Sequence, residues 1–132
     1  MAAFCGLRHP NVFGKVLSQS GSFGYSRGDA ELHDEENAPT SWGQLYLAFG
    51  EREHGWLMGQ FVRSRKLPLR FYLEVGKYEG NNPDDNRHFR DVLVAKGYPV
   101  VYSEYFGGHD YLTWRNSIGD GLIALLGKKS SR

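Results

Sequence analysis

His109, near the C-terminal end of the sequence, lies between residues that suit a general base. The segment Gly107-Gly108-His109-Asp110 follows the last predicted strand and precedes the last predicted helix. Two glycines let the backbone turn sharply and approach a substrate closely, and the near-neutral pKa of an imidazole suits proton transfer. A histidine in a structural turn or helix cap would give the same local pattern. Its position directly after a predicted strand favours His109 as a catalytic base.

A carboxylate that could orient this histidine lies earlier in the chain. Glu79 stands three residues beyond Gly76, past the end of another predicted strand. A triad carboxylate works from such a loop, and acid before histidine is the chain order of hydrolases whose triad runs serine, acid, histidine. Asp84 and Asp85 are rivals for this role. Asp85 has a competing explanation as a helix cap, and Glu79 as an exposed loop charge.

A nucleophile for these two groups is not evident in the chain. The motif Gly-x-Ser-x-Gly, which holds the serine on a sharp strand-to-helix turn, does not occur. Centred on Ser20 it would need glycine at positions 18 and 22, and both are serine. We therefore interpret segment 18–24 as a tight turn that lines the wall of a pocket, with Ser22 and Phe23 as candidate substrate contacts.

Other kinds of chemistry find little support. His9, His33, His54 and His88 are scattered without the spacing of metal ligands, so we predict no metal and no cofactor. A net charge of +1 with no basic stripe argues against nucleic acid, and no apolar run is long enough to span a bilayer. The single Cys5 cannot form an internal disulfide, which favours the cytoplasm.

The spacing of apolar residues and chain breakers predicts strands that alternate with helices. Helices are expected over 1–9, 53–66, 86–96 and 112–126, and strands over 13–17, 69–75 and 99–105. Loops are expected over 25–41 and 77–85, while 45–49 is ambiguous. This alternation is typical of a parallel sheet with helices on both faces, an α/β fold of three layers, α/β/α. Ligands of such sheets bind beyond the carboxyl ends of the strands, where 18–24, 77–85 and 106–110 lie.

Several segments in this order resemble enterochelin esterase and related esterases. They are Gly-Leu-Arg-His-Pro at 6–10, Phe-Gly-Lys-Val-Leu-Ser-Gln-Ser-Gly-Ser-Phe at 13–23, Leu-Pro-Leu-Arg-Phe-Tyr-Leu-Glu-Val-Gly at 67–76, and the segment 107–110 with Trp114 and Arg115. The resemblance implies an α/β-hydrolase that opens ester bonds, with His109 as catalytic histidine and Glu79 as triad acid. Trp114 and Arg115 could face an aromatic, anionic ligand, or they could simply dock the last helix.

The resemblance also implies what this segment lacks. The family nucleophile lies in a Gly-x-Ser-x-Gly-Gly segment directly before residues like 1–3, so we expect 1–132 to be a partial α/β-hydrolase domain, inactive alone, with that motif encoded upstream. The strand at 13–17 should then expose an edge through which copies associate into homo-oligomers. The alternative is a chain without catalytic function, a partner subunit or a degenerate binding module.

Overall fold

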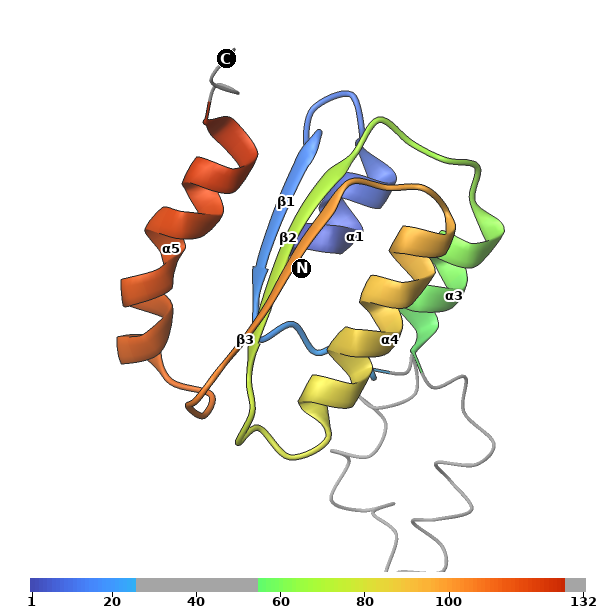
Figure 1. Cartoon of the computed structure of the whole chain (residues 1–132). Helices are drawn as coiled ribbons and strands as arrows, with labels where there is room; N and C mark the ends of the chain where they lie inside the picture. The colour runs from blue at the N-terminus through green and yellow to red at the C-terminus, as the bar shows by residue number, and fades with distance from the viewer. Residues whose placement is uncertain (26–54, 128–132) are drawn as a thin grey trace, which may run out of the picture.

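The computed structural model describes residues 1–25 and 55–127, and Figure 1 shows their arrangement. Strands and helices alternate along the chain, as predicted. The elements are α1 (Ala2–Arg8), β1 (Lys15–Gln19), α3 (Trp56–Arg63), β2 (Arg70–Gly76), α4 (Asn82–Ala95), β3 (Val100–Tyr105) and α5 (Tyr111–Leu126). The segment predicted as ambiguous at 45–49, and the polar stretch 25–41 beyond its first residue, lie outside the described residues.

The described strands form a parallel sheet in the order β1-β2-β3. Figure 1 shows α1, α3 and α4 on one face of the sheet and α5 on the other. The predicted three-layer α/β/α architecture is therefore confirmed. Because all strands run the same way, the turn after β1, the loop after β2 and the loop after β3 meet at one edge.

The core lies between β2 and the helices of the first layer. Phe71 of β2 packs edge-on against Phe61 of α3 and Phe89 of α4, with ring centroids 5.7 and 6.2 Å apart. On the other face of the sheet, α5 approaches closely through Gly121, where a Cβ atom would lie 2.6 Å from Leu17 Cδ1. The central strand is thus buried on both faces, as expected for a parallel sheet.

The predicted loop at 77–85 is wrong over its last four residues, because α4 begins at Asn82. Pro83 is tolerated there, since the amides of the first helical turn lack intrahelical acceptors anyway. Asp84 and Asp85 lie in that first turn, where negative charge is favoured, and Asn81 is the N-cap instead of Asp85. At the other end the C-cap is Lys96, and Gly97 follows with φ of +74°.

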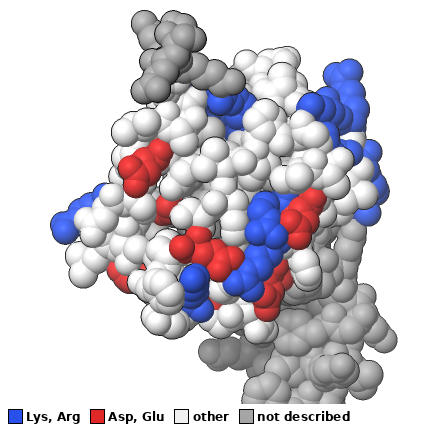
Figure 2. All heavy atoms as spheres, viewed as in Figure 1, with Lys and Arg blue, Asp and Glu red and all other residues white. Residues whose placement is uncertain are grey.

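Charged side chains of both signs are interspersed on the face of the molecule that Figure 2 shows. Arg87 of α4 bonds to Glu104 of β3 through two N–H groups, at 2.7 and 2.8 Å, and to Asp84 at 2.7 Å. Hydrogen bonds from Arg87 lower the pKa of Glu104 to about 2. This pairing connects α4 to β3 without creating a surface patch of a single charge sign.

No helix among the described residues has the length and apolar character needed to cross a membrane.

Candidate active site

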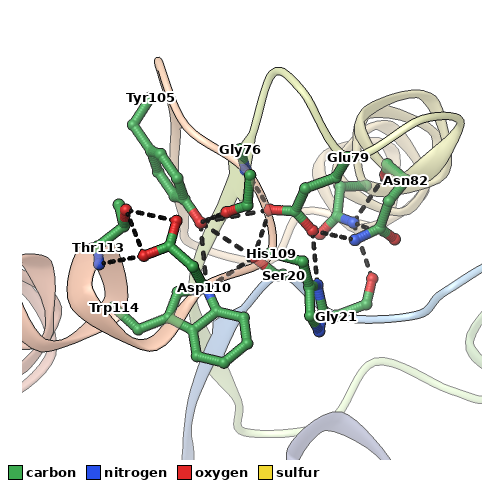
Figure 3. Close-up of polar contacts among 12 residues, drawn as sticks. Ser20, Gly21, Gly76, Glu79, Asn82, Tyr105, His109, Asp110, Thr113 and Trp114 are labelled. Atoms are coloured by element: carbon green, nitrogen blue, oxygen red, sulfur yellow. Dashed lines mark hydrogen bonds and ion pairs between the residues drawn. The ribbon is translucent and has the colours of Figure 1, made fainter.

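A histidine and a carboxylate meet on the loops that follow neighbouring strands (Figure 3). His109 Nδ1 lies 2.8 Å from Glu79 Oε2, with the imidazole 58% exposed and the carboxylate side chain only 2% exposed. Glu79 follows β2, and His109 stands between β3 and α5. The structure therefore brings together the two residues that the sequence singled out as acid and base.

The loops after β2 and β3 are held against each other by backbone contacts. The Tyr78 amide donates to the Gly107 carbonyl at 3.0 Å, and a Cβ atom on Gly76 would lie 2.4 Å from that same oxygen. Asp110 caps α5 by accepting a hydrogen bond from the Thr113 amide at 2.9 Å. The lack of a side chain at Gly76 and the capping hydrogen bond of Asp110 thus hold the loop that carries His109 in place.

Hydrogen bonds saturate both oxygens of the Glu79 carboxylate. Oε1 accepts from the Gly76 amide and the Ser20 hydroxyl, each at 2.6 Å, and Oε2 accepts from Asn82 Nδ2 at 2.9 Å as well as facing His109. Burial alone would raise the pKa of Glu79, but the hydrogen bonds from Ser20, His109, Asn82 and the Gly76 amide outweigh burial and lower it. Glu79 is therefore ionised at neutral pH.

The ionised carboxylate sets the tautomer of the neutral imidazole. A carboxylate only accepts hydrogen bonds, so His109 Nδ1 carries the hydrogen and Nε2 keeps a free lone pair. Trp114 packs edge-on against the imidazole, with ring centroids 4.7 Å apart and an interplanar angle of 88°. The exposed imidazole is thus oriented by a carboxylate and a ring, and can accept a proton at Nε2.

The rival carboxylates have other surroundings. Asp84 pairs with Arg87 at 2.7 Å on the exposed side of α4. Asp85 lies one residue further along the first turn of that helix and lines the cavity beside His109. Neither aspartate is the hydrogen-bond partner that the structure gives to His109 Nδ1.

Two open cavities meet at the imidazole. The smaller, of about 540 Å³, is lined by Ser22, Tyr25, Glu79, Asn82 and His109 among others. The larger, of about 1110 Å³, reaches from His109 over the turn after β1 to α1. Ser22 lines both cavities. Phe23 borders the larger one but is 4% exposed and stacks on Phe89 with centroids 4.1 Å apart.

The two candidates on α5 have different surroundings. Trp114 Nε1 donates to Ser20 Oγ at 2.9 Å and to Tyr105 Oη at 3.1 Å, so its N–H is engaged within the protein. Arg115 is exposed, and it is not among the residues that line the two cavities in the described part of the chain. Trp114 therefore belongs to the surroundings of His109, while Arg115 lies apart from them.

A second buried carboxylate, which was not predicted from the sequence, lies next to this site. Glu74 of β2 is 1% exposed and accepts hydrogen bonds from Gln19 Nε2 at 2.7 Å, from Tyr72 Oη at 2.9 Å and from the Ser117 hydroxyl. A charged residue between Leu73 and Val75, in the middle of a strand, was the available signal. The described residues contain no group of His, Cys, Asp and Glu side chains arranged to hold a metal ion.

The parallel sheet between two helical layers, with the acid and the histidine on loops at the carboxyl ends of its strands, agrees with an α/β-hydrolase fold. Solved structures agree. The enterobactin esterase from Shigella flexneri, crystallised with 2,3-dihydroxy-N-benzoyl-serine, superposes with a TM-score of 0.67 at 28% identity, over 93% of this chain and 27% of the esterase. The likeness in fold thus extends along nearly the whole chain.

Two curated proteins match the sequence along nearly the whole chain. The chain is 33% identical over 130 residues to the iron(III) enterobactin esterase of Dickeya dadantii, which covers 95% of this chain and 26% of that esterase. It is 28% identical to the iron(III) salmochelin esterase of Escherichia coli O6:H1, over 96% of this chain and 28% of the esterase. The chain is therefore homologous to a segment of these siderophore esterases, as the resemblance in sequence implied.

The chain spans about a quarter of the length of these curated relatives. No protein-family profile matches it.

Proposed function

We propose that residues 1–132 carry the base and acid of a serine ester hydrolase that acts on siderophore-type or related small esters. His109 is the general base and acid, and Glu79 orients it. The nucleophilic serine comes from a polypeptide segment outside these residues. The observation that carries the proposal is the 2.8 Å contact between His109 Nδ1 and Glu79 Oε2, which leaves Nε2 available beside two cavities.

The reaction would proceed by acyl transfer. The serine hydroxyl attacks the ester carbonyl and gives its proton to His109 Nε2. As the tetrahedral intermediate collapses, Nε2 returns the proton to the departing alcohol and an acyl-serine remains. Water then attacks the acyl-serine with His109 again as base, which releases the acid and regenerates the serine. Glu79 stabilises the imidazolium throughout and does not itself take the proton.

A second candidate is a non-catalytic binding role, which the absence of Gly-x-Ser-x-Gly from the 132 residues favours. Both roles fit a small-molecule ligand, and the single cysteine is compatible with a cytoplasmic location for either. They differ in whether the imidazole ever exchanges a proton with a serine.

A chimera separates these roles. Residues 1–132 would replace the matching segment of the Dickeya dadantii esterase, and the purified chimera would be assayed with enterobactin and a short-chain nitrophenyl ester. We expect hydrolysis by the chimera, and none above a buffer blank by the 132-residue chain alone, because a histidine without a positioned serine is a weak base in water.

The controls test the assignment of the nucleophile. Turnover by the isolated chain would contradict the proposal that the nucleophile lies outside these residues, and its complete loss in Ser20→Ala would make Ser20 the first candidate. A folded chimera that hydrolyses neither ester would favour the binding role.

We also expect the purified chain to self-associate. Within the described residues β1 pairs on one side only, with β2, so its other edge presents unpaired backbone donors and acceptors. Light scattering over a dilution series should give a mass that rises with concentration. A monomer at every concentration, with one cooperative melt, would show that this edge is protected.

A further inference from the structure

Ser20 has an unusual backbone conformation at the end of β1. Its φ is +55°, and it is the one non-glycine residue with positive φ among the described residues. An L-residue is disfavoured there because its Cβ crowds the backbone, so such positions persist where surrounding contacts hold them. Ser20 is also 4% exposed, and its amide donates to the Glu74 carbonyl at 2.7 Å. Its side chain is therefore held in one direction, toward the loop after β2.

The Ser20 hydroxyl contacts Glu79, Tyr105 and Trp114, as Figure 3 shows. It donates to Glu79 Oε1 at 2.6 Å and accepts from Trp114 Nε1 at 2.9 Å, while Tyr105 Oη lies 3.1 Å away. One donor and two acceptor positions are the full capacity of a hydroxyl. All of that capacity is directed at groups that surround His109.

We infer that Ser20 is a positioning residue, whose hydroxyl holds the Glu79 carboxylate with Oε2 directed at His109 Nδ1. The two oxygens of a carboxylate share one plane. Holding Oε1 between the Ser20 hydroxyl and the Gly76 amide, each at 2.6 Å, therefore fixes the direction in which Oε2 points. The inference rests on the proposed function, in which Glu79 is the acid.

Ser20 acts on the imidazole from a second side as well. Trp114 donates to the Ser20 hydroxyl and also packs edge-on against His109. The same hydroxyl thus anchors both the carboxylate and the ring that confine the imidazole. A nucleophilic serine would instead donate to the imidazole, whereas Ser20 donates to the acid and is only 4% exposed, although it borders the larger cavity.

The test uses the 132-residue chain and the variant Ser20→Gly. Glycine adopts positive φ readily, so this variant loses the hydroxyl without added backbone strain. Nuclear magnetic resonance would follow the Glu79 carboxyl ¹³C signal through a pH titration and the His109 ring ¹⁵N shifts of the neutral imidazole. We expect the pKa of Glu79 to rise, because a donor to the charged form is removed. We also expect the Nδ1–H tautomer of His109 to give way to a mixture.

Ser117→Ala is the matched control. This variant removes a hydroxyl that donates to the neighbouring carboxylate, Glu74. Within the described part of the chain, the Ser117 hydroxyl makes no hydrogen bond to Glu79. Both signals should stay at their wild-type positions in this variant. A folded Ser20→Gly chain with the wild-type Glu79 pKa and the wild-type tautomer would overturn the inference.

Activity of the chimera separates this inference from the proposed function. In that background Ser20→Gly should lower kcat at least tenfold and leave KM within about twofold, as expected when a group that orients the acid is lost. An active chimera in which Ser20→Gly changes neither kcat nor the resonance signals would reject only the positioning role. An inactive chimera, with the resonance shifts as expected, would reject the hydrolase proposal and leave the geometry of Ser20 and Glu79 intact.

Discussion

Replacing His109 by alanine in the chimera should lower kcat on the order of a millionfold, close to the rate without any catalytic base. In the proposed mechanism the imidazole takes the proton from the serine and returns it to the leaving alcohol, so both half-reactions should fail together. Substrate binding should change little, since most of the cavity lining is untouched. Stopped-flow or long-time assays of ester hydrolysis, with circular dichroism to verify folding, would measure this loss.

His88→Ala is the matched control for this variant. His88 is an exposed residue of α4 and lines neither cavity beside His109. It should keep the activity of the parent chimera. Equal losses in the two variants would point to a folding defect, and full activity of His109→Ala would show that another group is the base.

Replacing Glu79 by glutamine should lower kcat of the chimera by about 10⁴. Glutamine has nearly the shape of glutamate, but it can present an N–H to His109 Nδ1 where the carboxylate only accepts. The imidazole would then carry its hydrogen on Nε2, the position that receives the proton of the serine in the proposed mechanism. The charge that stabilises the imidazolium would be lost as well. Steady-state kinetics of the purified variant would measure both consequences in kcat.

Asp84→Asn is the control for the assignment of the acid. Asp84 lies on the exposed side of α4 and pairs with Arg87. Its loss should leave kcat unchanged and lower the free energy of unfolding by no more than about 1 kcal/mol, as expected for a surface charge in the first turn of a helix. If the two variants exchanged behaviour, Asp84 would be the acid and the α/β-hydrolase fold would still stand.

Local patterns in the sequence determined the order and kind of the elements. A strand-forming segment between Pro68 and Gly76 marked β2, and helical spacing of aliphatic residues marked α5, because each signal comes from residues near one another in the chain. The positions of Glu79 and His109 directly after strands then sufficed to place both at one edge of a parallel sheet. The start of α4 was missed because an asparagine-proline-aspartate run suits a loop as well as a first helical turn.

Only the tertiary structure decided how the side chains of the site face one another. Ser20 lies 59 residues from Glu79 and 94 from Trp114 in the chain, yet its hydroxyl bonds to both. Its positive φ has no signature in sequence, since serine is common in ordinary turns. Glu74 likewise finds its partners 55 and 43 residues away, in Gln19 and Ser117. Hydrogen bonds over such separations depend on how whole elements pack, and local sequence patterns do not specify that packing at the level of single side chains.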